Sequence, residues 1–136
     1  AGLMDGEGTI TLIPRKKRGS LNGYFSRISI VNTYIPVLNW VNTTFGGRVY
    51  IRKSTNQNHK SHGVWELSEV GAEDLIRELL SCLKIKKNQA EILLEYRKTV
   101  LDCQHYPDRL GLPEEIKRKR DNLYAQIRVL NKKGPK

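Results

Sequence analysis

The sequence predicts an α+β domain in which helices cover one face of a four-stranded antiparallel sheet and leave the other face open. Four segments alternate apolar and polar residues, as half-buried strands do. They fall into two pairs, residues 9–16 with 24–31 and residues 48–52 with 64–68. Each pair is followed by apolar residues at helical spacing. Residues 1–8 are expected to form the end of a further helix, which precedes the first strand. The resulting order, αββαββα, is typical of a two-layer domain.

The first eight residues, Ala-Gly-Leu-Met-Asp-Gly-Glu-Gly, combine apolar residues with two acids in one short stretch. Leu3 and Met4 favour burial, whereas Asp5 and Glu7 favour solvent or a ligand. As a pattern alone, the octet is explained equally well by a helix C terminus that runs into a strand and exposes two solvated acids. Composition does not distinguish Asp5 from Glu7 as a functional acid.

The first two strands, residues 9–16 and 24–31, are rich in β-branched and aromatic residues, which suit a half-buried sheet surface. The residues between them, 17–23, include glycine, serine and asparagine, which favour turns. These segments therefore predict a long hairpin. The third and fourth strands, residues 48–52 and 64–68, alternate strictly and are joined by a polar loop.

A helix is expected between the second and third strands. Asn32 or Thr33 is suited to cap its N terminus, and Pro36 is tolerated in its first turn. The glycines at 46 and 47 end it. Further helices are expected from Ala72, from about Asn88 and from Pro113.

The 136 residues fit a single domain, 1–136, with a basic C-terminal helix and tail at 112–136. Lys and Arg number 24 against 14 Asp and Glu, which gives a net charge of +10. Such an excess favours a polyanionic partner, most often nucleic acid. A ribosomal protein or a membrane-surface binder would carry the same excess, so the charge alone does not decide. The basic run at 117–120 wraps around its predicted helix, so some of its members serve only solubility.

Cys82 and Cys103 are the only cysteines, and two thiols do not make a disulfide framework, so we expect both to be reduced. The sequence shows no apolar run of membrane-spanning length, and we expect no signal peptide. His59 and His62 have ligand-like spacing but stand in a polar loop without nearby cysteines. We therefore expect an intracellular protein with neither a membrane partner nor a small-molecule substrate.

Alternation sorts the strand residues onto one apolar face and one polar face. We expect the polar face to contact DNA, because a curved sheet can enter the major groove. Solvation of an outer face explains the same pattern without DNA, but four arginines there favour the contact. Arg27 and Arg52 are the best candidates for base contacts, since arginine most often reads guanine. The expected DNA-contacting residues are Thr9, Thr11, Ile13, Arg15, Phe25, Arg27, Ser29, Arg48, Tyr50, Arg52, Val64, Glu66 and Ser68, with Lys16, Lys17 and Arg18 at the hairpin tip.

The opening octet resembles the LAGLIDADG motif of homing endonucleases without its first Leu. Residues 1–8 match the second to ninth positions, with Met4 for Ile, Gly6 for Ala and Glu7 for the second Asp. The resemblance extends through the four strands to about Ala90. It implies the LAGLIDADG homing endonuclease fold, with its four-stranded DNA-binding sheet. It also implies that the motif helix begins upstream, so we expect a short N-terminal piece to precede this sequence.

The resemblance implies a site-specific double-strand DNA endonuclease, intron-encoded or free-standing, that cuts a long pseudo-palindromic target and leaves 3′ overhangs. It implies Mg²⁺, for which Mn²⁺ or Ca²⁺ can substitute in the site, with Glu7 as the metal-binding acid and the Gly6 carbonyl as a further ligand. One acid per chain is a thin metal site, so a homodimer is expected. Ala1 and Gly2 suit close helix packing in the dimer interface, where Asp5 also lies and helps to fix the turn at the helix end.

Two accessory residues follow from the same resemblance. The stretch 28–33 resembles the end of the family's second strand, where Asn32 would reach the active site. The stretch 83–90 resembles a Lys-x-Lys-x-x-Gln-Ala segment, so that Lys86 is the active-site lysine and Lys84 the second choice. Without the resemblance, Lys86 is a solvated residue before a helix. An RNA splicing maturase, or a DNA-binding regulator that has lost cleavage on the same fold, remains the alternative.

Overall fold

The computed structural model describes residues 1–15, 23–53, 61–103 and 113–132. None of the helices in these ranges is both long and apolar enough to cross a membrane. The predicted order αββαββα is confirmed, and two further helices follow it. The elements are α1 (Gly2–Glu7), β1 (Gly8–Pro14), β2 (Tyr24–Asn32), α2 (Ile35–Phe45), β3 (Arg48–Arg52), β4 (His62–Ser68), α3 (Glu69–Leu79), α4 (Lys87–Asp102) and α5 (Glu114–Asn131).

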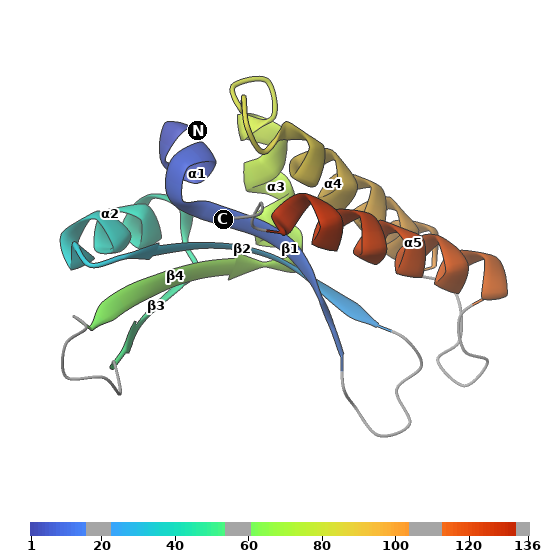
Figure 1. Cartoon of the computed structure of the whole chain (residues 1–136), viewed down its shortest axis with the longest axis horizontal. Helices are drawn as coiled ribbons and strands as arrows, with labels where there is room; N and C mark the ends of the chain where they lie inside the picture. Colours follow the sequence, from blue (N-terminus) through green and yellow to red (C-terminus); the bar gives the residue numbers. More distant parts are fainter. Residues whose placement is uncertain (16–22, 54–60, 104–112, 133–136) are drawn as a thin grey trace.

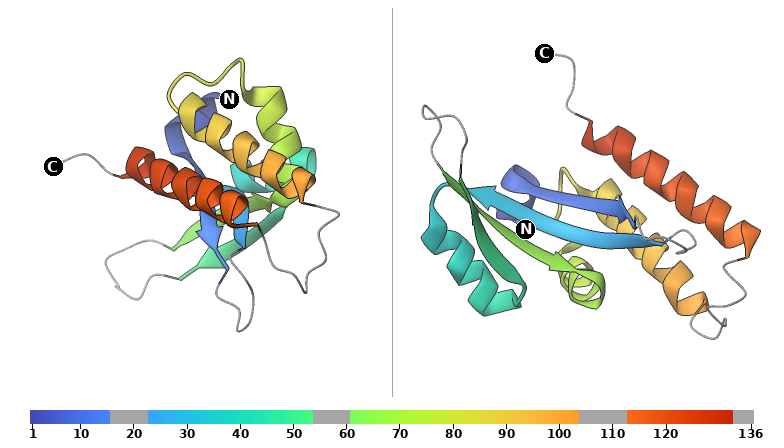
Figure 2. Two further views of the ribbon diagram at one scale, coloured as in Figure 1. Left: turned by 90° about the vertical axis from the view of Figure 1, so that its right-hand side faces the viewer. Right: turned by 90° about the horizontal axis from the view of Figure 1, so that it is seen from below.

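The strands form one antiparallel sheet in the order β1-β2-β4-β3. The pairing of β2 with β4 joins the two ββα units, with Ile28 opposite Leu67 and Ile30 opposite Trp65. In Figure 1 the sheet is bowed, and the helices lie on its convex side. Seen from below, the strands cross the centre of the molecule with the helices beside or behind them (Figure 2). No helix of the described residues covers the opposite, concave side of the sheet.

Alternate residues of the strands supply the hydrophobic core beneath the helices. Trp65 is fully buried at the centre of the sheet, and its indole N–H donates to the Gly46 carbonyl at 2.8 Å. That bond satisfies the one polar atom of the indole where α2 ends. The other large apolar side chains that are fully buried are Ile10, Leu12 and Ile28 from the sheet, Leu38 from α2, Ile76 from α3, Leu93 from α4 and Ile127 from α5.

Helix α5 belongs to the helix-covered side of the sheet. The buried Arg120 donates to the Thr99 hydroxyl at 2.8 Å and lies over the Tyr96 ring. The Tyr24 hydroxyl of β2 donates to Asp121 at 2.5 Å, and Asn131 donates to the Ile10 carbonyl at 2.8 Å. The basic run at 117–120 therefore does wrap around the helix, and Arg120 stabilises the fold.

Strand ends differ from the prediction by one or two residues, and the starts of α2 and α3 differ in a way that has a structural reason. Helix α2 begins at Ile35, because β2 stays paired with β4 as far as Asn32 opposite Gly63. Asn32 is thus the last strand residue and does not cap the helix. Helix α3 begins directly after β4 at Glu69, which has a φ of +56°. Its carboxylate holds this uncommon conformation by accepting the Ser26 N–H at 3.0 Å and an ion pair from Arg97 at 2.9 Å.

Helix α1 passes into β1 at Gly8 without an intervening loop. The Gly8 N–H donates to the Met4 carbonyl, which ends the helix, while the backbone of Gly8 is already extended. A Cβ at Gly8 would overlap the Met4 sulfur and lie 2.7 Å from the Met4 carbonyl oxygen. Glycine is required here because helix and strand approach each other so closely.

Gly8→Ala is expected to lower the free energy of unfolding by about 1–3 kcal/mol, because the added methyl overlaps buried Met4. Gly6→Ala is the matched control, since a Cβ at Gly6 meets no atom within 4 Å. It is expected to leave stability unchanged or slightly higher. Urea denaturation of both variants measures the difference, and equal stabilities would contradict this account of the junction.

Candidate active site and nucleic-acid interface

Glu7 is the last residue of α1, and its side chain is exposed at the junction with β1. Met4, one helical turn earlier, is buried in the core and anchors this end of the helix. Because Gly8 starts the strand at once, the backbone on both sides of Glu7 is in regular secondary structure, and the position of the Glu7 side chain is fixed at its base. A carboxylate presented in this way is available to a ligand without reorganisation of the chain.

Asn32 lies beside Glu7, as predicted, although 25 residues separate them. The pairing of β1 with β2 brings them together, since Gly8 stands opposite Ile30. The Asn32 amide donates to the Glu7 carboxylate at 2.5 Å, and its carbonyl oxygen accepts the Tyr34 N–H at 2.8 Å. The second bond points the amide group of Asn32 toward Glu7, and this orientation is not visible in the sequence.

Lys86 reaches the same junction from the segment before α4. Its ammonium group donates to the Met4 carbonyl at 3.1 Å and to the Gly8 carbonyl. These carbonyls lie at the C terminus of α1, where a cation is favourable. Lys86 is therefore partly buried against the helix end and is not the solvated residue that spacing alone suggests. Lys84 is exposed, so Lys86 is the lysine that the fold brings to the Glu7 junction.

The Asp5 carboxylate accepts three backbone N–H groups, from Lys84 at 2.7 Å, Ile85 at 3.1 Å and Lys86 at 3.0 Å. These donors, led by that of Lys84, hold the pKa of the Asp5 carboxyl below its usual value of 3.8, although desolvation opposes the shift. Asp5 was expected to have a structural role at the helix end. Its carboxylate binds the segment that carries Lys86, about eighty positions away in the sequence, and holds that segment against the helix end.

The polar residues of the strands share one face, as alternation predicted. Across β1 and β2, Thr9 lies opposite Ser29, Thr11 opposite Arg27 and Ile13 opposite Phe25. Across β4 and β3, Arg48 lies opposite Glu66 and Arg52 opposite His62. At the end of β1 the Arg15 guanidinium stacks over the Phe25 ring at 4.2 Å. We call this surface the open face.

Two predicted DNA contacts on the open face need correction. Val64 is only 3% exposed, between Val31 and Tyr50 on the neighbouring strands, so the prediction that it contacts DNA is wrong. Glu66 is 8% exposed, and its carboxylate is already paired with Arg27 and Arg48, so it is not free to accept from a base. Lys16, Lys17 and Arg18 lie outside the described residues.

Two residues of the open face were missed by the sequence analysis. Val31 is 44% exposed and follows Ser29 in the alternation of β2. His62 begins β4 and stands opposite Arg52. Val31 lies within the predicted second strand but was not assigned to a face, and His62 precedes the predicted start of the fourth strand by two residues. Continuing the alternation from Ser29 to Val31, and from Val64 back to His62, would have found both.

The sequence matches no protein-family model and no curated protein. Its structure is similar to solved homing endonucleases. The first is I-CvuI in complex with its target, at TM-score 0.74 and 16% identity, covering 99% of this chain and 82% of that one. The archaeal intron-encoded I-Vdi141I complexed with DNA gives 0.77 and 17%, covering 99% and 83%. The LAGLIDADG homing endonuclease I-GzeII in complex with its DNA target gives 0.65 and 16%, covering 93% and 41%.

The chain has the LAGLIDADG homing endonuclease fold. This result confirms the fold predicted from the opening octet and the order of elements. The octet forms the short helix α1 of that fold, and Glu7, Asn32 and Lys86 meet where the helix enters the sheet.

Within the described residues, no group of three or more His, Cys, Asp and Glu side chains is arranged to hold a metal ion. In the LAGLIDADG fold of this chain, Glu7 is an exposed carboxylate, whereas Asp5 is occupied by backbone donors. One chain therefore offers a single free acid at the helix end. A Cβ at Gly2 or Gly6 would meet no atom within 4 Å, so this side of α1 leaves room for another element.

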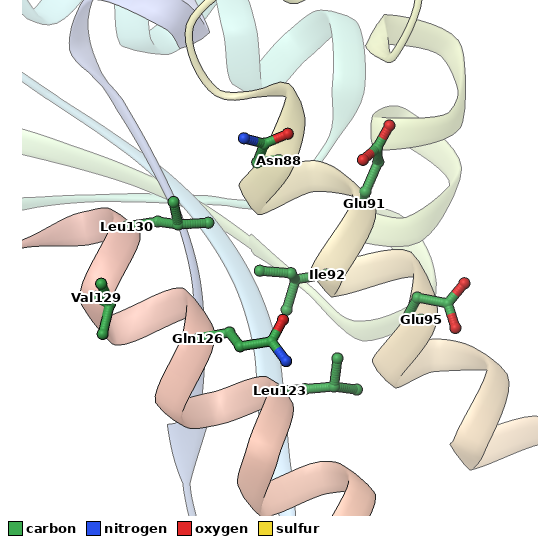
Figure 3. Close-up of a pocket in the computed structure, with 8 residues that line it drawn as sticks. All are labelled: Asn88, Glu91, Ile92, Glu95, Leu123, Gln126, Val129 and Leu130. Carbon is green, nitrogen blue, oxygen red and sulfur yellow. The ribbon is translucent and has the colours of Figure 1, made fainter.

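A groove of about 540 Å³ lies between α4 and α5 (Figure 3), and none of Glu7, Asn32 and Lys86 lines it. It is in the helix layer of the LAGLIDADG fold, and Glu91 and Glu95 at its rim would repel a nucleic acid. We therefore do not assign function to it. Its lining residues are Asn88, Glu91, Ile92, Glu95, Leu123, Gln126, Val129 and Leu130.

Asp5→Asn is expected to destabilise the fold most near neutral pH and progressively less in acid. Because the folded pKa of Asp5 is depressed, its contribution is fully present above the unfolded value of 3.8 and is lost as pH falls through the lower, folded value. The difference in free energy of unfolding between wild type and Asp5→Asn should stay constant between about pH 5 and 7 and shrink below 3.8.

Asp74→Asn serves as the control, because Asp74 is exposed on α3. It is expected to change stability little near neutral pH. Urea titrations across the pH range measure both variants. A difference for Asp5→Asn that does not shrink in acid would contradict the role given to its carboxylate.

Proposed function

We propose that the chain is a site-specific, metal-dependent DNA endonuclease of the homing type that acts as a homodimer. The observation that carries the proposal is the convergence of Glu7, Asn32 and Lys86 at the end of α1. At one junction, an acid can hold a metal ion, an amide can orient water, and a cation can stabilise the charge that develops in phosphodiester hydrolysis. They lie in a fold whose solved members I-CvuI and I-Vdi141I are seen in complex with DNA.

The open face is the proposed DNA-binding surface. It carries Arg15 directly after β1, Arg27 on β2, and Arg48 and Arg52 on β3, in a chain of net charge +10. A curved sheet of this kind fits the major groove, where guanidinium groups can read guanine and also contact phosphates. We propose that further residues of the open face also contact DNA. They are Thr9, Thr11, Ile13, Phe25, Ser29, Tyr50 and Ser68, together with Val31 and His62.

Glu7 is the proposed metal ligand, with the carbonyl of Gly6. The donor set fits Mg²⁺, which takes oxygen ligands and is commonly held by one or two carboxylates together with substrate phosphates. Bound Mg²⁺ supplies a more acidic water and stabilises the leaving oxygen. Two of the similar structures, both of I-CvuI, were determined in the presence of Ca or Mg, which supports a divalent cation here. Mn²⁺ or Ca²⁺ can replace Mg²⁺ and bind to the same oxygen ligands.

The chain's own residues hold this acid in place. Asn32 donates to the Glu7 carboxylate and fixes its direction. The same amide can orient a water molecule, since it is itself fixed by the Tyr34 N–H. Lys86 places a positive charge within the same junction, where it offsets the charge that develops on the phosphate.

A homodimer follows from the single free acid. Two strands have to be cut, and each chain supplies one Glu7, so a two-fold arrangement gives both scissile phosphates a complete set of carboxylates. We propose that the α1 helices of two copies pack through Ala1, Gly2 and the exposed edge at Gly6. Asp5 contributes indirectly, because it holds segment 84–86 beside that edge. The target would then be long and roughly palindromic, cut to leave 3′ overhangs, and the protein would work inside the cell.

Glu7→Gln is expected to abolish cleavage, by at least about a thousandfold, because the amide no longer carries the charge that holds the metal. DNA binding should stay within a few-fold, since the open face is untouched. Nicking and double-strand cleavage of a selected target in Mg²⁺, together with gel-shift titration in Ca²⁺, measure the two properties.

Glu78→Gln, at an exposed position on α3, is the isosteric control and should cleave like wild type. Unchanged cleavage by Glu7→Gln would overturn the metal assignment. Tight, specific binding by wild type without cleavage in either Mg²⁺ or Mn²⁺ would favour the cleavage-inactive regulator over the enzyme.

A further inference from the structure

One carboxylate stands in the middle of the cationic open face. Glu66 is on β4, an inner strand, and is 8% exposed. Its carboxylate pairs with Arg48 of β3 at 2.5 Å and with Arg27 of β2 at 3.5 Å, and it accepts the Tyr50 hydroxyl at 3.4 Å. Among the described strand residues of this face, it is the only acid.

An acid on a DNA-binding surface is unfavourable unless it has a second task. A buried carboxylate needs partners, and losing one leaves it uncompensated. A second residue of β4 also restrains Arg27, since the Arg27 Nε donates to the Ser68 hydroxyl at 3.4 Å. The Arg48 side chain is 72% exposed, yet Glu66 holds its guanidinium. Both guanidinium groups are thus oriented before any DNA arrives.

We propose that Glu66 is a positioning residue that sets the specificity of the open face by orienting Arg27 and Arg48 and keeping them from binding phosphates. The inference rests on the proposed function, since it takes DNA as the partner. Reading a guanine edge requires a guanidinium group at a defined angle, whereas binding a phosphate requires only a nearby charge. An arginine that remains paired with Glu66 gives little phosphate neutralisation, so binding to unrelated sequences is weakened more than binding to the target.

Arg52 lies on β3 with Arg48, but it is not paired with Glu66. It lies two residues from Tyr50. Its guanidinium group donates to the Tyr50 hydroxyl at 3.5 Å and lies over the Tyr50 ring, and it forms no salt bridge with the described residues. No carboxylate holds it there. Arg52 is therefore expected to contribute fully to phosphate binding, whereas Arg48 on the same face is expected to contribute less.

Salt dependence of binding to a random-sequence duplex tests this, measured without divalent metal so that no cleavage occurs. Each neutralised phosphate adds about 0.9 to the slope of log affinity against log salt. Glu66→Gln releases two guanidinium groups, so the slope should steepen by about 1–2 and affinity at low salt should rise by about tenfold. The ratio of target to random affinity should fall.

Glu95→Gln is the matched control. Glu95 also pairs with two cations, Lys98 at 3.0 Å and Lys119 at 3.9 Å, but on the helix side. It removes the same charge, and its slope should equal that of wild type. Equal slopes for Glu66→Gln and Glu95→Gln would overturn the inference. Circular dichroism establishes that each variant is folded.

A second comparison does not depend on Glu66→Gln folding. Arg52→Ala should lower the slope by about 1, and Arg48→Ala by clearly less. An equal decrease in slope for Arg52→Ala and Arg48→Ala would contradict the proposal that Glu66 restrains Arg48. Wild type that fails to bind any duplex at low salt would overturn the proposed function itself, and the inference with it, whereas binding with equal losses overturns the inference alone.

Discussion

The junction between α1 and β1 depends on the contact between the Asp5 carboxylate and the backbone N–H groups of residues 84–86. This contact holds the segment before α4 against the end of α1, and it thereby places the Lys86 ammonium on the carbonyls of Met4 and Gly8. Since Gly8 starts β1 at once, fixing the helix end also fixes the direction of the first strand and the position of Glu7. The two acids of the opening octet therefore divide the work: Asp5 builds the junction, and Glu7 is left exposed at it.

Positive charge is divided between the two layers in a similar way. In the helix layer, Arg97 is buried between Glu69 and Glu73, and Arg120 lies on Thr99 and Tyr96, so these guanidinium groups stabilise packing and are not available to a polyanion. Arg97 also holds the pKa of the Glu73 carboxyl below its usual value. On the open face, by contrast, the arginines are at least partly exposed. The net charge of +10 thus overstates the charge that the sheet can present, and it is the placement that favours DNA.

Alternation predicted the open face because a strand places successive side chains on opposite sides whatever its neighbours are. It could not predict that Val64 is covered by side chains of the neighbouring strands or that Glu66 is paired, because both depend on which strands lie side by side. The resemblance of the octet assigned Glu7, and the resemblances of the stretches 28–33 and 83–90 assigned Asn32 and Lys86. The fold brings the three residues together. The partners of Asp5 and the orientation of the Asn32 amide could not be predicted from local sequence, since each depends on backbone groups positioned by tertiary structure.

The central claim is that two copies of this junction cut both strands of one DNA site. Selection of cleaved molecules from a randomised duplex library in Mg²⁺ tests it most directly, because cleavage, site length and symmetry are read from the same products. The account predicts enrichment of a long, roughly two-fold-symmetric sequence whose products carry 3′ overhangs. Enrichment of a short asymmetric site, or no cleaved product from a protein that binds the library, would contradict it.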